Sequence, residues 1–389
     1  MQNISRSDKD YLDLSLALAR RALGNVWPNP AVGCVLVAQG HSAGHSAGHL
    51  ADHVVGHIVG RGWTQPGGRP HAEAKALEQA AAAAKGATAY VSLEPCAHHG
   101  QTPPCAEALI AAGIARVVIA VGDPDPRVNG RGAKMLQDAG IEVDWAEPGI
   151  AQAAAALNGG FIAKVRDARP LVTLKLASTL DGRIATATGE SQWITGPQAR
   201  AKGHMLRAEH DAILIGIGTA LADDPELSCR LPGMLGQSPI RVVLDSRLRL
   251  PGDCRLVQGA PDLPLWLMTG PDCRNADMQS KGVDVIGVGL DDQGRIDPAA
   301  MLAVLAGQGI TRLLVEGGSA VATSLLAAGL VDRLAWFRAP GLMGGDGLPV
   351  VGSLGVEALA QMPRFRRDVQ NQGIELLGDD VLESYVFQA

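Results

Sequence analysis

One histidine, one glutamate and two cysteines in the first third of the sequence have the types and spacing of a zinc-dependent hydrolytic site. His71 and Glu73 form an H-x-E motif, and Cys96 and Cys105 follow as P-C-x8-C. An H-x-E motif with a later pair of cysteines is typical of zinc nucleobase deaminases. Three ligands, His71, Cys96 and Cys105, would leave one coordination position of zinc open for water. Glu73 would then move protons between this water, a ring nitrogen and the leaving amine.

A structural zinc site is the alternative interpretation. It would need a fourth ligand, and either His98 or His99, which lie between the two cysteines, could provide it. A closed structural site has no use for a carboxylate, so the position of Glu73 favours a catalytic site. For the two histidines we favour ordering of the loop or contact with a substrate.

Helices and strands are expected to alternate around these residues, which indicates an α/β domain. The predicted elements are a helix over 8–23, strands over 31–38 and 57–62, a helix over 71–84, a strand over 88–93, a helix from Cys105, a strand over 116–122, a helix over 131–139 and a strand over 141–145. His71 and Cys105 both fall where a helix begins. Their side chains, with that of Glu73, can therefore point into one pocket at the helix ends.

A second α/β unit is expected from Pro170 onward. Its predicted elements are strands over 171–179, 212–217, 240–245, 264–269, 283–288 and 311–315, and helices over 197–210, 298–307 and 319–328. The Ala-rich segment before Pro170 favours helix. We therefore predict an α/β protein with domains over 1–149 and 170–389, joined by a helical connector over 150–169.

Composition argues against several classes of function. The 389 residues carry a net charge of −6 without a block of Lys or Arg, unlike most nucleic-acid-binding proteins. The apolar runs are shorter than the roughly 20 residues of a membrane span, and residues 1–10 are polar, unlike a signal peptide. The six cysteines are dispersed, so disulfides are not expected. We expect a cytoplasmic enzyme that acts on a small molecule, without nucleic-acid or membrane partners.

A histidine repeat precedes the H-x-E motif. Within GHSA-GHSA-GHLA and its flanks a histidine recurs at every fourth position, at His41, His45, His49, His53 and His57. The glycines between them argue against a stable helix, so an expanded surface loop is the favoured interpretation. A secondary metal site is the alternative, and a required catalytic role is the least favoured.

Long motifs in both halves of the chain resemble those of a known family. The first half contains HAEAKAL (71–77), LEPCAHHGQTPPC (93–105) and GDPDPRVNGRG (122–132). The second half contains LKLASTLDGRIATATGESQWITGPQAR (174–200), LADDPELSCR (221–230), LDS (244–246) and VEGGS (315–319). Over nearly its whole length the chain is thus similar to the bacterial bifunctional riboflavin-biosynthesis deaminase-reductases. The C-x8-C arm is typical of this family rather than of cytidine deaminases.

The resemblance implies a cytidine-deaminase-like fold for the first domain and a dihydrofolate-reductase-like fold for the second. It implies zinc-dependent hydrolytic deamination of 2,5-diamino-6-ribosylamino-pyrimidinone 5′-phosphate, followed by NADPH-dependent reduction of the ribosyl group to ribityl. Zn²⁺ and NADPH are the implied cofactors, and a homo-oligomer is the implied assembly. Carried over by motif, His71, Cys96 and Cys105 hold the zinc and Glu73 is the proton shuttle.

The resemblance also implies binding residues, all by position within the motifs. Those for NADPH are Ala177, Trp193, Thr219, Asp223, Ser246, Gly318, Ser319, Ala320, Val321, Ala322, Thr323 and Ser324. Those for the substrates are Ser191, Arg207, Leu227, Arg230 and Glu316 in the reductase, and Asn29, Asp123 and Asp125 in the deaminase. Lys175 is expected to line the reductase site as well, with pairing to a carboxylate as the alternative. Arg207 and Arg230 are expected to clamp the 5′-phosphate. A Gly-Gly turn that enters a helix suits a phosphate group as well.

Two rival functions stay open on the sequence alone. A deaminase of nucleosides or tRNA, with a non-catalytic second domain, would show a basic patch and no need for NADPH. A zinc- and nucleotide-binding regulatory protein would keep the fold without turnover, and Glu73 argues against it. The sequence shows no obvious proton donor for the reductase step.

Overall fold

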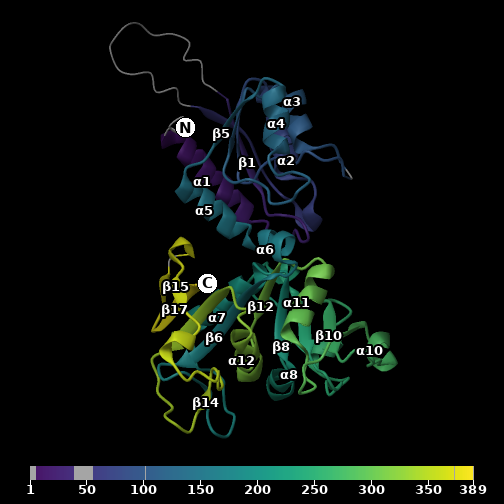
Figure 1. The fold of residues 1–389 in the computed structure, drawn as a ribbon, viewed down its shortest axis with the longest axis vertical. Coiled ribbons are helices and arrows are strands. Elements are labelled where there is room, and N and C mark those ends of the chain that lie inside the picture. Colours follow the sequence, from purple (N-terminus) through teal and green to yellow (C-terminus); the bar gives the residue numbers. More distant parts are fainter. Residues whose placement is uncertain (1–5, 39–55, 101, 372, 389) are drawn as a thin grey trace. The chain divides into compact units, whose positions relative to one another are not determined.

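The computed structural model describes residues 6–38, 56–100, 102–371 and 373–388. The chain forms two compact units, Met1–Arg166 and Asp167–Ala389 (Figure 1). Four histidines of the repeat, His41, His45, His49 and His53, lie outside the described residues, and His57 begins strand β2. Within the described parts of the chain, every helix is too short or too polar to cross a membrane.

The first unit is built on a five-stranded mixed sheet with the order β2–β1–β3–β4–β5. Its strands are β1 (Gly33–Ala38), β2 (His57–Trp63), β3 (Thr88–Val91), β4 (Arg116–Ile119) and β5 (Glu142–Trp145). β1 pairs antiparallel with β2 and β3, whereas β3, β4 and β5 run parallel. The carboxyl ends of the three parallel strands therefore meet at one edge of the sheet, where loops commonly carry function.

Alternating side chains of these strands enter two apolar clusters, because successive residues of a strand point to opposite faces. Cys34 and Leu36 of β1 pack in one cluster with helices α2 (Ala72–Ala80), α3 (Cys105–Ala111) and α4 (Arg131–Asp138). Val35 and Val37 pack in the other cluster with α1 (Arg6–Arg20) and α5 (Pro148–Leu157). Both faces of the sheet are thus covered, which fixes the positions of the helix ends.

The segment expected as a connector forms two helices, α5 and α6 (Gly159–Asp167). Three side chains of α5, those of Ile150, Ala154 and Leu157, are buried in the cluster that also contains α1. By its packing α5 therefore belongs to the first unit, and the boundary between the compact units falls between Arg166 and Asp167.

The second unit contains a larger sheet with the order β11–β10–β9–β8–β12–β6–β13–β17–β15, and β16 also pairs with β17. Its strands are β6 (Leu171–Thr179), β8 (Ala212–Gly216), β9 (Ile240–Leu244), β10 (Leu265–Thr269), β11 (Val283–Gly287), β12 (Arg312–Val315), β13 (Arg333–Ala339), β15 (Phe365–Arg367), β16 (Ile374–Leu377) and β17 (Asp380–Phe387). Pairing is parallel from β11 through β13 and antiparallel beyond it. The parallel part presents its carboxyl ends at one edge, as in other ligand-binding α/β sheets.

The helices of the second unit connect these parallel strands. They are α7 (Pro197–Ala208), α8 (Ile217–Asp223), α9 (Arg255–Gln258), α10 (Ala276–Ser280), α11 (Pro298–Gly307) and α12 (Ser319–Ala327). A separate pair of short strands joins β7 (Arg183–Ala185) to β14 (Leu348–Pro349).

Most predicted elements are present, with differences at their ends. The strand predicted over 171–179 is β6 in full. The helix predicted over 71–84 is α2 followed by a 3-10 turn, Ala81–Ala84, because Ala81 takes a left-handed φ of 46°. Short helix α8 was not predicted, although it carries two of the predicted NADPH contacts.

Candidate functional site

Two helix starts bring the three predicted zinc ligands together. His71 is the residue before α2, Cys105 is the first residue of α3, and Cys96 lies in the loop that follows β3. Their ligand atoms lie within 4.8 Å of one another. His71 Nδ1 is 3.3 Å from Cys105 Sγ and 3.7 Å from Cys96 Sγ. Zn–N and Zn–S bonds of about 2.0 and 2.3 Å in a tetrahedron space the ligands by about 3.3–3.8 Å, so the donors fit one zinc ion.

The cysteine sulfurs are held by the start of α3. The backbone N–H of Cys105 donates to Cys96 Sγ over 3.2 Å. Hydrogen bonds from Cys105 and then His71 outweigh burial and lower the pKa of Cys96 to about 4. A thiolate at a helix N-terminus is the form that binds a metal ion. The part of the chain that the structure describes offers neither His98 nor His99 to this group of ligands, which disfavours the structural-zinc alternative.

Glu73 lies beside the ligands in the first turn of α2. Its side chain is buried, with 3% of the residue exposed. Burial is the main cause that raises its pKa above the usual range of a glutamate, and the nearby Cys96 adds to it. A carboxyl group with a raised pKa both accepts and returns protons more readily near neutral pH. This is the behaviour that the proton-shuttle hypothesis requires.

Glu94 is a structural residue of this site that the sequence analysis missed. Its carboxylate accepts N–H groups of Gly130 and Ala133, each over 3.0 Å, at the start of α4. A Cβ at Gly132 would lie 2.0 Å from the carbonyl oxygen of Pro95, so only glycine allows this close approach. Glu94 and Gly132 therefore fix the segment that carries Cys96. The signal was an acidic residue directly before Pro-Cys, whose partners at the start of α4 lie 36 and 39 residues further along the chain.

The three residues predicted to border the deaminase pocket differ in their surroundings. Asn29 packs against the backbone of Gly68, where a Cβ would meet its amide nitrogen at 1.9 Å. Burial raises the pKa of Asp123 to about 6, and its carboxylate accepts the N–H of Asp125 over 2.8 Å. Asp125 forms a paired hydrogen bond with Arg127, which lowers the pKa of Asp125. Asp125 is thus engaged within its own loop, and Asp123 is the freer carboxyl group.

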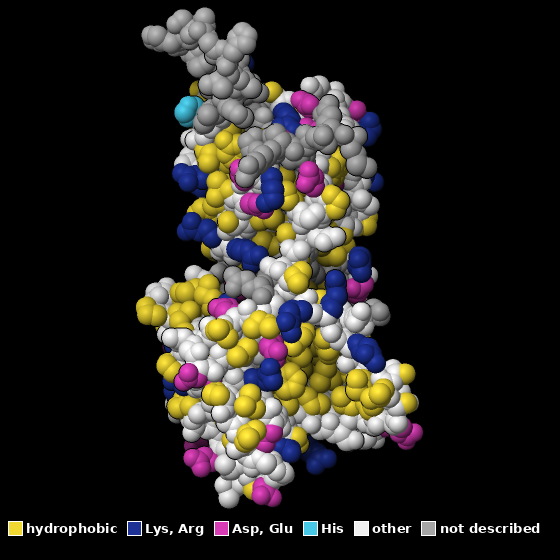
Figure 2. Space-filling view, turned by 90° about the vertical axis from the view of Figure 1, so that its left-hand side faces the viewer, with side chains coloured by type: hydrophobic (Ala, Val, Ile, Leu, Met, Phe, Trp, Pro, Cys, Tyr) yellow, Lys and Arg dark blue, Asp and Glu magenta, His cyan; other side chains and the backbone are white. Residues whose placement is uncertain are grey.

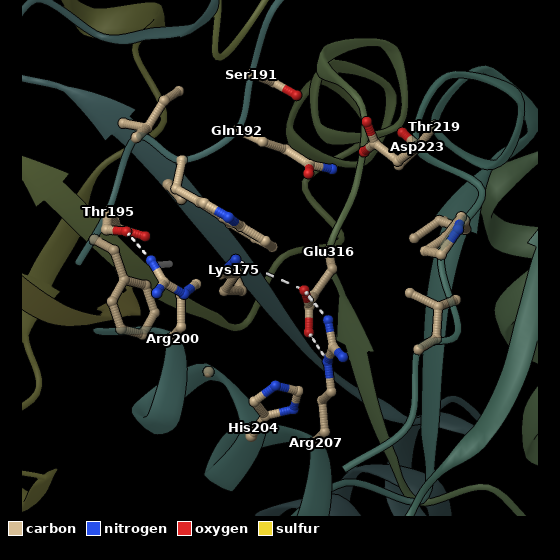
Figure 3. A pocket seen from close by; sticks show the side chains of 18 of the residues that line it. Lys175, Ser191, Gln192, Thr195, Arg200, His204, Arg207, Thr219, Asp223 and Glu316 are labelled. Atoms are coloured by element: carbon tan, nitrogen blue, oxygen red, sulfur yellow. Dashed lines mark hydrogen bonds and ion pairs between the residues drawn. The ribbon is translucent and has the colours of Figure 1, made fainter. Parts of the chain in front are cut away.

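A pocket of about 680 Å³ lies in the second unit, at the carboxyl ends of β6, β8 and β12 (Figure 3). Ten of the residues predicted to bind NADPH or substrate line it: Lys175, Ala177, Ser191, Trp193, Arg207, Thr219, Asp223, Leu227, Arg230 and Glu316. Ser246 and the run from Gly318 to Ser324 do not line it. Segments that are far apart in the sequence thus meet at one cavity.

An ion-pair network lies at the base of this pocket. Arg207 Nε donates to Glu316 Oε1 over 2.7 Å and Arg207 Nη2 to Oε2 over 3.0 Å, while Lys175 Nζ is 3.6 Å from Oε2 (Figure 3). Burial alone would raise the pKa of Glu316, but the charges of Arg207 and Lys175 outweigh it and lower the pKa to about 2. Glu316 is therefore a fixed negative charge between two cations.

Arg207 forms further hydrogen bonds within the protein, which bear on its predicted role in binding the phosphate. Its Nη1 donates to the carbonyl oxygen of Ser228 over 3.0 Å, in addition to the paired bond with Glu316. Three of the five N–H groups of a guanidinium are thereby engaged within the protein. Arg230, by contrast, is exposed and has a single ion pair, of 3.4 Å, with Glu226. Of the two arginines, Arg230 is the one more available to a ligand.

The Gly-Gly turn before α12 forms a cradle at the edge of the pocket. Gly318 precedes α12 with a φ of 60°, which disfavours any side chain. A Cβ at Gly318 would lie 3.0 Å from Thr219 Oγ1, and one at Gly317 would lie 3.3 Å from the same atom. Because Thr219 lines the pocket, the start of α12 lies near the edge of the pocket, and free N–H groups at a helix start suit a phosphate. The turn therefore has the open glycine backbone that the predicted NADPH contact requires.

Several lining residues were missed in the sequence. Arg200 and His204 lie on α7 together with Arg207, at intervals of four and three residues. That spacing places them on one face of the helix, a signal that the predicted helix over 197–210 already contained. The guanidinium of Arg200 lies 4.7 Å from the ring centre of Trp193. Glu226 and Arg255 also line the pocket and carried no recognisable pattern.

Comparison with known proteins agrees with both sites. The family described as "RibD C-terminal domain" matches residues 170–382, and the "Cytidine and deoxycytidylate deaminase zinc-binding region" matches residues 5–121. The riboflavin biosynthesis protein RibD of Escherichia coli is 41% identical over 378 residues, which cover 94% of this chain and 97% of that protein. The crystal form 1 structure of Acinetobacter baumannii RibD is 36% identical, with a TM-score of 0.84 and 99% of each chain covered.

A further solved structure gives the same result. It is a diaminohydroxyphosphoribosylaminopyrimidine deaminase/5-amino-6-(5-phosphoribosylamino)uracil reductase from Thermotoga maritima, 32% identical, with a TM-score of 0.81 and coverage of 98% of this chain and 99% of that chain. Fold and sites together define a two-domain enzyme with a zinc-binding deaminase domain and an NADPH-using reductase domain. The chain belongs to the RibD family of riboflavin-biosynthesis deaminase-reductases.

Proposed function

We propose that the first unit hydrolyses the exocyclic amine of 2,5-diamino-6-ribosylamino-pyrimidinone 5′-phosphate and that the second unit reduces the ribosyl group of the product to ribityl. The observation that carries this proposal is the presence, in one chain, of a converging His-Cys-Cys set beside a buried glutamate and of a cation-lined pocket. The relative from Thermotoga maritima, named for both reactions, supports the same pair of activities.

In the deaminase site, His71, Cys96 and Cys105 would hold zinc, which lowers the pKa of a bound water to about 7. Glu73 takes both protons of the attacking water in turn: it passes the first to the ring nitrogen and the second to the departing amine, which leaves as ammonia. Its burial keeps this proton exchange away from bulk water. Asn29 and Asp123 border the pyrimidine, and Asp125 orders the loop that it shares with Asp123 through its bond with Arg127.

In the reductase site, bound NADPH would supply a hydride to C1′ of the ribosylamino group, whose bond to the ring oxygen opens while that oxygen takes up a proton. Thr219, Asp223, Trp193 and Ala177 line the side of the pocket where the cofactor would bind, and Ser246 and residues 318–324 would extend its site beyond the cavity. Ser191, Leu227, Arg230 and the pair Arg207–Glu316 would hold the sugar phosphate. Lys175, 3.6 Å from Glu316, is placed to orient the reacting sugar.

A coupled assay on the full chain tests the proposal. The pyrimidine phosphate should release ammonia first, and NADPH should be oxidised only after deamination. Glu73→Gln should abolish most ammonia release yet still oxidise NADPH when the deaminated compound is supplied. Glu78→Gln, an exposed position of the same helix paired with Lys75, is the matched control. Full ammonia release by Glu73→Gln would refute the role given to Glu73.

We further propose the boundaries of the functional domains, the assembly and the location of the enzyme. The deaminase domain covers 1–149 and the reductase domain 170–389, with 150–169 between them.

The chain forms a homo-oligomer in the cytoplasm. Figure 2 shows hydrophobic side chains between Lys and Arg on one face of the second unit. Leu359, Val369 and Leu376 are 75–78% exposed in that unit. A mass near 40.3 kDa in light scattering would overturn the oligomer proposal.

A further inference from the structure

One carboxylate in the reductase pocket is shared between two arginines. Glu226 Oε2 lies 3.4 Å from Arg230 Nη1, and Glu226 Oε1 accepts a hydrogen bond from Arg255 Nη2. All three residues line the pocket. The motifs predict Arg230 as a substrate ligand, and its exposed position in the pocket suits that role, but Glu226 and Arg255 are left without a role.

The loop that carries Glu226 and Arg230 is hydrogen-bonded to the backbone of Arg255, which lies outside the loop. Asp224 and Leu227 have left-handed φ values of 38° and 58°, which are unfavourable for residues with side chains. The backbone N–H of Arg255, at the start of α9, donates to Asp224 Oδ1 over 2.9 Å. Leu227 is buried in the core of the unit. The loop is therefore fixed at both positions, and the two ion pairs of Glu226 act on an already ordered backbone.

The two ion pairs of Glu226, with Arg255 and with Arg230, are of unequal strength. Arg255 and Glu226 are in direct hydrogen-bond contact, whereas Arg230 is at the longer distance of 3.4 Å. The side chains of Glu226, Arg230 and Arg255 are 38%, 46% and 53% exposed. Ion pairs exposed to this extent contribute little and are readily exchanged. A doubly charged phosphate would compete effectively for Arg230 against the more distant carboxylate.

We propose that Glu226 occupies, on Arg230, the place that the phosphate of the substrate takes, and that Arg255 is a positioning residue which retains Glu226 when the phosphate displaces it. This inference rests on the proposed function, because it takes Arg230 as a ligand of the 5′-phosphate. Arg255 lowers the cost of exchange, since the displaced carboxylate keeps a cationic partner. The substrate class selected in this way is a phosphate ester.

The proposal predicts opposite effects for two neighbouring substitutions. Glu226→Gln removes the competitor and should lower both the reductase KM for the deaminated pyrimidine phosphate and the Ki of inorganic phosphate, by about two- to fivefold, the size expected of an exposed ion pair. Arg255→Gln leaves Arg230 as the cationic partner of Glu226, beside a 3.5 Å contact with the Ser228 hydroxyl, and should raise both constants by a similar factor. The double variant should behave like Glu226→Gln, because Arg255 acts only through Glu226. The effects should fall on KM and not on kcat.

The experiment measures reductase kinetics of the full chain for these three variants, with Arg230→Gln beside them. Arg295→Gln, which breaks an exposed pair with Asp291 outside the pocket, is the control. Arg255→Gln keeps the backbone N–H bond to Asp224, and thermal unfolding checks that each variant is folded.

The outcomes separate this inference from the function on which it rests. If Arg230→Gln leaves KM unchanged, the assignment of the phosphate to Arg230 fails. If Arg230→Gln raises KM but Glu226→Gln raises it too, or the two single effects simply add in the double variant, the exchange between Glu226 and phosphate is wrong while the proposed function stands.

Discussion

The two sites of this chain are built on different principles. The zinc site takes its ligands from two helix starts and one loop, within 35 positions of the sequence, and its ligand atoms converge within 4.8 Å. The reductase pocket has about 680 Å³ and is lined by segments from Lys175 to Phe337. Its central pair, Arg207 and Glu316, is 109 positions apart. A compact site is fixed by local chain geometry, whereas a wide pocket depends on long-range ion pairs.

This difference determines how each site should respond to damage. In the zinc site, the donor atoms already have the spacing that a zinc ion requires, and the deamination depends on bound zinc. In the reductase pocket, charge is balanced within the protein. Glu316 forms ion pairs with Arg207 and Lys175. Glu226 forms ion pairs with Arg230 and Arg255. Loss of one partner there leaves another charge uncompensated.

Removal of zinc should have the largest effect and should separate the two sites. A chelator that strips zinc from the full chain is expected to abolish ammonia release, because three ligands without the ion cannot activate water. Oxidation of NADPH with the deaminated substrate should persist. Metal content and the two rates, measured on one sample, check this. Parallel loss of both rates would contradict the view that the sites are independent.

Glu316→Gln should damage the second site through its ion pairs. Removing one partner of a buried pair costs about 3–5 kcal/mol, since the other charge stays buried. Glu316 and Arg207 are 9% and 14% exposed, so the unfolding midpoint of the variant should fall and reduction should be lost. Asp277→Asn, which breaks an exposed pair with Lys281, is the matched control and should be near neutral. Unchanged unfolding of Glu316→Gln would show that the pair is not structural.

The same carboxylate should make stability depend on pH. The pKa of Glu316 is about 2 in the folded chain, against 4.5 for an unperturbed glutamate such as that of the unfolded chain. The ionised form therefore favours folding. This contribution, about 3 kcal/mol, is present above roughly pH 4.5 and is lost as the pH falls toward 2. Chemical unfolding at several pH values would measure it, and the dependence should shrink in Glu316→Gln.

Gly318→Ala should produce a smaller effect, confined to the cofactor. A side chain there meets Thr219 Oγ1 at 3.0 Å and fills the approach to α12, so KM for NADPH should rise by about tenfold, as expected of a loss near 1.4 kcal/mol. Gly329→Ala is the control, because it has a similar φ of 65° with open space around it. If both variants raise KM alike, backbone strain rather than cofactor approach is the cause.

The sequence predicted the compact site far better than the wide one. His71, Glu73, Cys96 and Cys105 were found from types and spacing, since a helix start places neighbouring residues in one direction. Glu94 and Gly132 were missed, because the acidic residue before Pro95-Cys96 does not by itself show which distant helix its carboxylate caps.

In the second unit, the residues of the pocket came from the resemblance, and ten of them do line one cavity. The sequence alone does not show that Arg207 pairs with Glu316. Glu316 follows β12 and Arg207 lies on the helix before β8, and these segments are neighbours only because β8 and β12 are adjacent in the sheet. Helix α8 was overlooked since its seven residues are too few for a periodic pattern. Ser246, by position, follows β9 and remains a prediction.

Each described apolar cluster draws its residues from one unit only, and the chain passes between the units once, at Arg166–Asp167. Two self-sufficient cores on a single polypeptide are synthesised in a ratio of one to one. Synthesis of this chain therefore supplies the two sites in equal number. A change in the expression of this chain alters both sites together, and only an effect on one site of the folded protein changes their ratio.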